Sequence, residues 1–172
     1  MRTKENLVNP VSDYYLYQPS TIASRVYLYP KEIGYFFYEP GYWRSRIQYD
    51  SFLLMYIAKG TCQIQLPNQQ LQNATSGQVV LIDCYIPHEY GFNCNSEVSW
   101  MHFDGSLARD FYELITANHG NIISPSNPFP ITNGLEQMLH VFRNSKPLKE
   151  GEASEMITQM LNTLLYTQAY SG

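Results

Sequence analysis

The chain has 172 residues, of which 44% are hydrophobic and 15% are charged, and its net charge is −4. This composition excludes a disordered chain and predicts one compact domain, because the apolar side chains are numerous enough to form a core. Lys59 and Arg109 are the only Lys or Arg residues between Arg46 and Arg143, which excludes a basic stripe that would follow the phosphate backbone of DNA.

Residues 1–22 are predicted to form an N-terminal arm. They combine polar residues with Pro10, Pro19 and a tyrosine cluster, and they lack the periodicity of a helix or a strand. The tyrosines favour an arm that docks onto the folded body, and a flexible terminus is the alternative.

Residues 23–105 are predicted to form a β-rich body. Short runs rich in Tyr, Val, Ile and Phe alternate here with Gly, Pro and Asn, a pattern typical of a barrel or a sandwich. The run CQIQL alternates strictly, which predicts a strand with one buried face. The predicted strands are RVYLY (25–29), YFFYE (35–39), WRSRIQY (43–49), SFLLMYIAKG (51–60), CQIQL (62–66), QVVLID (78–83) and VSWMHF (98–103).

After Gly105 the apolar period changes from two to about 3.6 residues, which predicts helices. The first is expected over 106–118. The second is expected to start at Asn133, because Asn133-Gly-Leu-Glu136 has the spacing of a capping box, and the third is expected over 152–169. The apolar stripe of the third is broad enough to be shared with a second chain, and purely intramolecular packing is the alternative. The stripes are Leu107, Phe111, Leu114 and Ile115 on the first helix and Met156, Ile157, Met160, Leu161, Leu164 and Leu165 on the third.

We expect no metal site, no cofactor and no catalysis. A stable metal site usually needs three or four convergent ligands, whereas His88 and His102 lack an HxH pattern and a third partner. Motifs for nucleophilic catalysis and for phosphate binding are missing. Three cysteines without CxxC spacing, and no signal peptide, predict a reduced, cytoplasmic chain. No apolar run approaches the roughly 20 residues of a membrane span.

Binding of a small molecule is the expected function. The strand period of two places Trp100 and His102 on one face of VSWMHF, where an indole can stack on a ring and an imidazole can bond a hydroxyl group. His88 and Tyr90 likewise share a face of their strand. A plain core position is the alternative for Trp100.

Two arginines add a possible polar contact. Arg44 and Arg46 share a face of WRSRIQY, and two guanidinium groups at this spacing can bind hydroxyl groups or a carboxylate. A solvent-facing strand is the alternative for both.

Three segments between residues 52 and 105 resemble the N-terminal sensor domain of AraC-type transcription regulators. They are FLLMYIAKGTCQIQL, LQNATSGQVVLIDCYIPHEYGF and EVSWMHFDG, in the order and spacing of the family. The resemblance implies a mainly β, cupin-like double-stranded β-helix (jelly-roll) barrel over residues 23–105 and a C-terminal helical dimerisation segment over residues 106–172. It also implies that the arm, residues 1–22, can close over an effector pocket. The family's DNA-binding domain, with two helix-turn-helix units, is not expected within this chain.

Within this resemblance, Tyr90 and Trp100 match positions that line the effector pocket of the arabinose-responsive member. Val98 replaces a pocket histidine, and the family's pocket arginine falls near Glu39, so arabinose in the same pose is not implied. His88 matches a frequent family residue whose role is structural. The expected ligand-binding residues are Tyr90, Trp100, His88, His102, Arg44, Arg46 and Glu39.

The sequence therefore leads to the hypothesis of a ligand-sensing and dimerisation domain of a cytoplasmic bacterial AraC-family regulator. A small effector, a mono- or oligosaccharide, is expected in the barrel, and the C-terminal helices are expected to form a homodimer. DNA is expected to be bound only through the missing C-terminal domain, and no membrane partner is expected. The alternatives are a metal-dependent cupin enzyme, such as a sugar isomerase or dioxygenase with its metal at His88 and His102, and an assembly module without a cavity.

Overall fold

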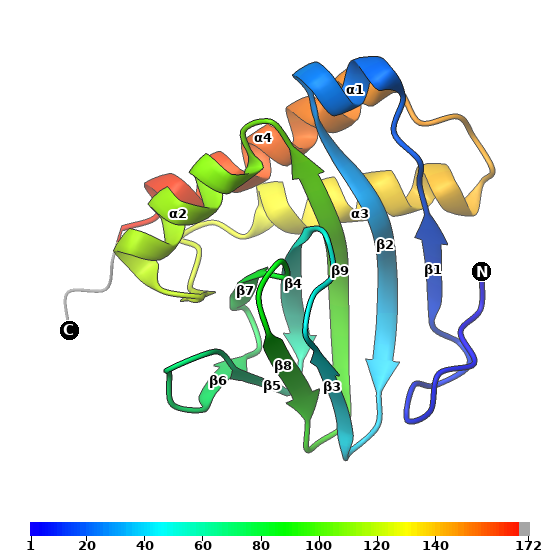
Figure 1. The fold of residues 1–172 in the computed structure, drawn as a ribbon. Helices are drawn as coiled ribbons and strands as arrows, with labels where there is room; N and C mark the ends of the chain where they lie inside the picture. Colours follow the sequence, from blue (N-terminus) through cyan, green and yellow to red (C-terminus); the bar gives the residue numbers. More distant parts are fainter. Residues whose placement is uncertain (169–172) are drawn as a thin grey trace.

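The structure is a computed structural model, and it describes residues 1–168 (Figure 1). Ten strands and four helices lie within this part of the chain. In chain order they are β1 (Asp13–Leu16), α1 (Thr21–Val26), β2 (Leu28–Tyr38), β3 (Tyr42–Arg46), β4 (Phe52–Lys59), β5 (Thr61–Gln65), β6 (Gln72–Thr75), β7 (Val79–Asp83), β8 (His88–Phe92), β9 (Ser96–Gly105), α2 (Ala108–His119), β10 (Ile122–Ile123), α3 (Phe129–Arg143) and α4 (Glu150–Tyr166).

The strands form two antiparallel sheets. One sheet has six strands in the order β1-β2-β9-β4-β7-β10, and the other has four in the order β3-β8-β5-β6. From β2 to β9 the chain passes back and forth between the sheets in the manner of a jelly roll, except that β5 and β6 pair with each other in the smaller sheet. α3 and α4 cross the far side of the larger sheet (Figure 1). This arrangement confirms the predicted mainly β, cupin-like double-stranded β-helix barrel followed by helices.

The larger sheet is buried on both faces, and the strand period of two divides its side chains between two cores. On β9, Met101 and Phe103 point to an outer core shared with the helices, whereas Val98 and Trp100 point to an inner core between the sheets. The neighbouring strands β4 and β7 alternate in the same way. The prediction that both faces of VSWMHF are covered is therefore confirmed, and the inner face is where a ligand site can form.

The helices start and end at positions that differ from the prediction in two places. α3 starts at Phe129, directly after Pro128, so Asn133 lies inside the helix and the predicted capping box is wrong. Pro130 lies in the first turn of α3, where a proline is favoured because its missing N–H needs no partner. α4 starts at Glu150 and its last helical residue is Tyr166, while the predicted end at residue 169 lies outside the described residues.

Most of the predicted α4 stripe packs within the chain. Four of its residues are buried in the outer core, and the other two are partly buried against it. The buried ones are Ile157, Met160, Leu161 and Leu164, and the partly buried ones are Met156 and Leu165. The α2 stripe differs, because Ile115 is buried but Leu107 and Leu114 are 55% and 57% exposed. Within residues 1–168, no helix has both the length and the apolar character needed to cross a membrane.

The N-terminal residues are part of the folded unit. β1 pairs with β2 at the edge of the larger sheet, although the sequence shows no strand periodicity there. The predicted strand over residues 25–29 is wrong in its first half, which belongs to α1. This short helix forms because the Ser20 hydroxyl accepts a hydrogen bond from the backbone N–H of Ala23, at 3.1 Å, and caps its first turn.

Candidate functional site

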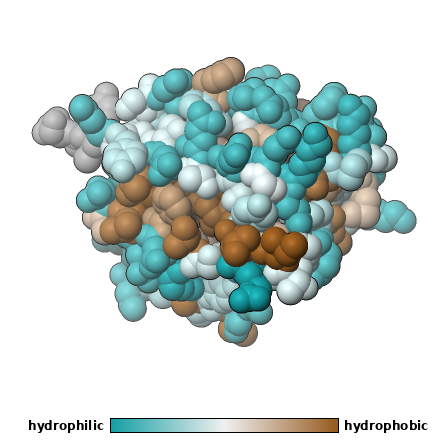
Figure 2. Space-filling view, turned by 90° about the horizontal axis from the view of Figure 1, so that it is seen from above, coloured by the Kyte–Doolittle hydropathy of each residue, from teal (hydrophilic) through white to brown (hydrophobic). Residues whose placement is uncertain are grey.

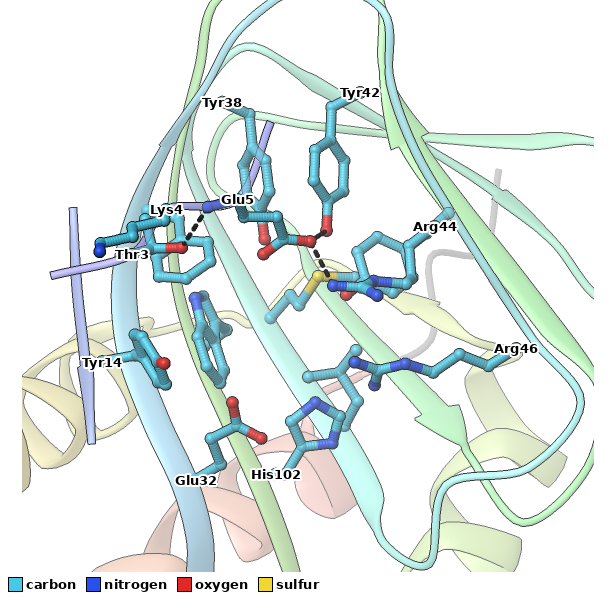
Figure 3. A pocket seen from close by; sticks show the side chains of 15 residues that line it. Thr3, Lys4, Glu5, Tyr14, Glu32, Tyr38, Tyr42, Arg44, Arg46 and His102 are labelled. Atoms are coloured by element: carbon cyan, nitrogen blue, oxygen red, sulfur yellow. Dashed lines mark hydrogen bonds and ion pairs between the residues drawn. The ribbon is translucent and has the colours of Figure 1, made fainter. Parts of the chain in front are cut away.

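A cavity of about 350 Å³ lies inside the barrel, between the two sheets. Its walls come from β2, β3, β4, β8 and β9, and residues at the N-terminus close one side of it (Figure 3). A volume at the low end of the range for small-molecule pockets suits a ligand of about one ring. The lining side chains are Thr3, Lys4, Glu5, Tyr14, Glu32, Phe36, Tyr38, Tyr42, Arg44, Arg46, Leu53, Met55, Tyr90, Trp100 and His102.

Five of the seven predicted ligand-binding residues line this cavity, namely Arg44, Arg46, Tyr90, Trp100 and His102. Glu39 does not, because it follows the end of β2 and is exposed in the turn to β3. His88 is buried beside a separate hollow that also touches Arg46. The structure therefore removes Glu39 from the cavity wall and leaves His88 in an adjoining position.

Trp100 provides the aromatic wall at the centre of β9. Its indole ring lies against Gly34 on the paired strand β2, where an added Cβ would be only 2.6 Å from the ring. Phe36 packs its ring edge-on at a centroid distance of 5.0 Å. Trp100 is 5% exposed, and its buried Nε1 donor has no hydrogen-bond partner within residues 1–168. A buried donor without a partner costs free energy, so this N–H is available to a ligand acceptor.

His102 presents a neutral imidazole to the cavity. Its Nδ1 shares a 2.9 Å hydrogen bond with the hydroxyl of Ser51, a residue that sequence reasoning missed. Burial is the main cause that holds the pKa of His102 well below its usual value, and the positive charge of Arg46 acts in the same direction. The bond to Ser51 fixes the ring orientation, as a neighbouring group does for a ligating or hydrogen-bonding histidine.

Arg44 is held by a residue from the N-terminal segment. Its guanidinium group forms an ion pair with Glu5, whose Oε1 also accepts a 2.6 Å hydrogen bond from the Tyr42 hydroxyl (Figure 3). Burial lowers the pKa of Arg44, but Tyr42 and Glu5 outweigh this effect and raise it. Burial and the bond to Glu5 raise the pKa of Tyr42 as well. The side chains of Glu5, Tyr42 and Arg44 form a polar cluster that holds the N-terminal segment, residues 1–22, over the cavity.

Arg46 has a different environment. Its guanidinium carbon lies 4.2 Å from the centroid of the Tyr49 ring, a cation–π geometry. The Tyr49 hydroxyl donates to Oε2 of Glu32 at 2.7 Å, and burial together with this bond raises the pKa of Tyr49 to about 12. The Nη1 atom of Arg46 is buried and finds no acceptor among the described residues.

Sequence reasoning missed several lining residues, and one of them carried a readable signal. Glu32 shares the parity of Gly34, Phe36 and Tyr38 on β2, and that parity faces the inner core. Extending the predicted strand back from residue 35 would have found it. Glu5 offered no such signal, because its contact with Arg44 spans 39 residues of sequence.

Few side chains in the described part of the chain are placed to bind a metal ion. Among residues 1–168, no group of three or more His, Cys, Asp or Glu side chains is placed to hold a metal ion. Nδ1 of His88 is bonded to the backbone oxygen of Ile86 at 2.8 Å, and burial is the main cause that lowers the pKa of His88. Burial also raises the pKa of the Cys62 thiol, which disfavours a reactive thiolate.

Comparison with known proteins agrees with this geometry. A model of the family described as "AraC-like ligand binding domain" matches residues 29–161. A search of the curated proteins found no match.

Solved structures with a similar fold include three that span different protein types. A cupin superfamily protein from Desulfitobacterium hafniense is 14% identical with a TM-score of 0.41, over 59% of this chain and 82% of that one. The protein YhaK from Escherichia coli is 11% identical with a TM-score of 0.47, over 55% and 44%. A mutant of Bacillus subtilis oxalate decarboxylase is 16% identical with a TM-score of 0.38, over 49% and 23%.

A jelly-roll barrel with a cavity lined by aromatic and charged side chains defines a class, the small-molecule-binding barrels of the cupin type. The family match runs from β2 into α4 and covers most of the chain. The chain therefore belongs to the family of AraC-like ligand binding domains.

Proposed function

We propose that this domain senses a small effector for a cytoplasmic bacterial transcription regulator and that the effector is a sugar. The observation that carries the proposal is the cavity of about 350 Å³, which is lined by rings and hydrogen-bonding groups and closed by the N-terminal segment. The regulator's DNA contacts are assigned to a helix-turn-helix domain that lies outside this chain. The cavity is assigned no catalytic step.

The lining chemistry suits a polyhydroxylated ring. Trp100 and Tyr90 offer flat apolar faces for the C–H groups of a sugar, and His102 and Glu32 offer hydrogen-bonding atoms for its hydroxyl groups. The remaining wall is rich in charged and hydroxyl-bearing side chains, which suit a ligand with many hydroxyl groups better than an apolar one.

A route from the cavity to the helices follows from the contacts of the N-terminal segment. Glu5 reaches into the cavity wall, and eight residues later Asp13 forms an ion pair with Arg143 of α3, with Nε to Oδ2 at 2.7 Å. Glu150 at the start of α4 accepts hydrogen bonds from Tyr17 and Ser20, at 2.9 Å from the tyrosine hydroxyl. An effector that favours one position of Glu5 would therefore shift the arm relative to the helices, by no more than its difference in affinity for the two states.

The proposal includes a homodimer formed through the helices. Apolar side chains gather in a band across the helical face seen in Figure 2. Exposed apolar residues of the helices include Ile22 and Val26 on α1 and Leu114 on α2, which are 67%, 63% and 57% exposed. A contiguous apolar patch on a surface is one mark of a protein interface. Light scattering on the purified chain measures its mass and tests the dimer.

A thermal-shift screen against mono- and oligosaccharides tests the sensor function. A ligand at 100 times its dissociation constant adds about 2.7 kcal/mol to the free energy of unfolding, which raises the melting temperature measurably. Trp100→Phe keeps an aromatic ring beside Phe36 but removes the unpartnered Nε1 donor and part of the flat face, so it should fold and show a smaller shift. The matched control Trp43→Phe changes an indole that is 45% exposed outside the cavity, and it should keep the full shift.

Two results would contradict the proposal. The first is the absence of any shift with the whole panel. The second is one equivalent of tightly held Fe, Mn or Zn at His88 and His102 in the purified protein, which would favour a metal-dependent cupin enzyme instead.

A further inference from the structure

The two arginines of the cavity differ in how their charges are balanced. Arg44 is paired with Glu5 and is therefore neutralised from within the chain. Arg46 forms no ion pair with any described residue, and its buried Nη1 has no acceptor. A buried donor on a charged group is costly to leave unpaired, and the Tyr49 ring beneath it supplies only a cation–π contact.

The charge of Arg46 faces the cavity from the smaller sheet, and the opposite wall carries the complementary chemistry. Figure 3 shows Arg46 on one side, Glu32 on the other and His102 between them. Glu32 already accepts one hydrogen bond from Tyr49, and a carboxylate has capacity for further donors. A ligand that satisfies both walls therefore needs an anionic acceptor at one end and hydroxyl donors at the other.

We propose that the effector is a sugar acid, whose carboxylate pairs with Arg46 while its hydroxyl groups bond to Glu32 and His102. A planar carboxylate matches the two parallel N–H donors of a guanidinium group, which a single hydroxyl does not. The proposal rests on the proposed sensor function and narrows the class of its ligand from sugars in general to uronic or aldonic acids.

Three competing ligand classes fit less well. A neutral sugar could offer the buried Nη1 of Arg46 only an uncharged acceptor. A phosphorylated sugar brings close to two negative charges, whereas Arg44 is already paired with Glu5 and Lys4, the remaining cation of the lining besides Arg46, is exposed to solvent. A larger dicarboxylate would place its second charge near Glu32, which repels it.

Calorimetric titration with matched sugar pairs tests the inference. Galactose is compared with galacturonate and glucose with glucuronate, because each pair differs only in the carboxylate. We expect the acids to bind at least 10-fold more tightly than the neutral sugars. Arg46→Met keeps an unbranched apolar side chain but removes the charge and the fork of donors, and it should weaken binding of the acid roughly 10- to 100-fold and binding of the neutral sugar by a smaller factor.

Arg25→Met is the matched control, since it removes the same charge from an exposed position on α1. It should leave both affinities unchanged. Arg46→Lys is a second variant, because it keeps the positive charge but loses the two parallel N–H donors of the guanidinium group. It should retain part of the preference for the acid. Unfolding curves of all three variants verify that each one folds.

The outcomes separate this inference from the sensor proposal. Equal binding of acid and neutral sugar, unchanged in Arg46→Met, would overturn the sugar acid while leaving the sensor function intact. Binding of the acid that survives in Arg46→Met would also overturn it, because the carboxylate would then lie elsewhere. Failure of every sugar, acid or neutral, to bind would overturn both.

Discussion

Gly34→Ala is a small substitution with a large expected effect on the cavity. Gly34 pairs with Trp100 on one side and with Tyr14 of β1 on the other. A Cβ at this position would be 2.6 Å from Cζ2 of Trp100 and 2.8 Å from the backbone oxygen of Asp13. Both neighbours are stiff, since one is a packed indole and the other is part of a strand.

Two effects of opposite sign decide the magnitude. Ala is favoured over Gly within a strand by roughly 0.5–1 kcal/mol, because it loses less backbone freedom on folding. Carbon–carbon contacts are optimal at about 3.5–4.0 Å, so the Trp100 ring or the β1 backbone must shift by about 1 Å. Such overpacking costs about 1–3 kcal/mol. The steric cost should win, and we expect a net destabilisation of about 1–2 kcal/mol.

Urea unfolding followed by circular dichroism gives the free energy of unfolding, and calorimetry gives the affinity for the effector found in the sugar screen. Affinity should fall as well, because a displaced indole narrows the cavity. Gly151→Ala is the matched control. Its Cβ would lie 3.4 Å from the Tyr27 hydroxyl, an ordinary contact, and Ala favours the helix there, so stability should stay equal or rise. A Gly34→Ala protein as stable as the wild type, with unchanged affinity, would refute the assigned packing of Trp100.

Two further predictions concern the cavity histidine and the arm. Because burial holds the pKa of His102 below its unfolded value, its contribution to stability is complete above about pH 6.5 and is lost as pH falls toward the folded pKa. In urea unfolding at several pH values, His102→Gln should therefore reduce the fall in the free energy of unfolding between pH 7 and 5, and the part that remains comes from His88, whose pKa is also lowered. His140→Gln, at an exposed site, is the control and should leave this pH dependence unchanged. Arg143→Met removes the ion pair with Asp13, so it should speed amide hydrogen exchange at residues 13–16 without a matching change elsewhere and lower the free energy of unfolding by about 1 kcal/mol or less. Arg109→Met is the control: it breaks an ion pair of similar exposure with Asp83 and should leave exchange at residues 13–16 unchanged.

The sequence predicted the central strands and their inner faces because a period of two is a local property. Trp100 and His102 follow from the parity of VSWMHF, and both line the cavity. Glu39 was assigned through a resemblance in a region where loop lengths differ, and the residue that reaches the cavity from β2 is Glu32. When a loop differs in length between two relatives, an alignment can match the wrong residue of the following or preceding strand. The alternation of side chains along the strand does not reveal such an error.

The position of the N-terminal segment, residues 1–22, could not be predicted from local sequence patterns. Its place over the cavity depends on Glu5 meeting Arg44 and on Asp13 meeting Arg143, pairs that are 39 and 130 residues apart. No periodicity encodes such contacts. The start of α3 is a milder case, because Asn133 and Pro130 both carry helix-start signals and the local sequence does not choose between them.

The division of the larger sheet between two cores has a practical consequence for protein engineering. Side chains that face the cavity and side chains that pack against the helices take alternate positions of the same strand, so a library can vary the first set and keep the second. On β9, Trp100 and His102 can be varied to seek new ligands, while Met101 and Phe103 are kept to preserve packing against the helices. β4 and β7 alternate between the two cores as well, with odd-numbered residues facing the inner core on β4 and even-numbered residues facing it on β7. This separation makes the barrel a suitable starting point for biosensors with altered specificity.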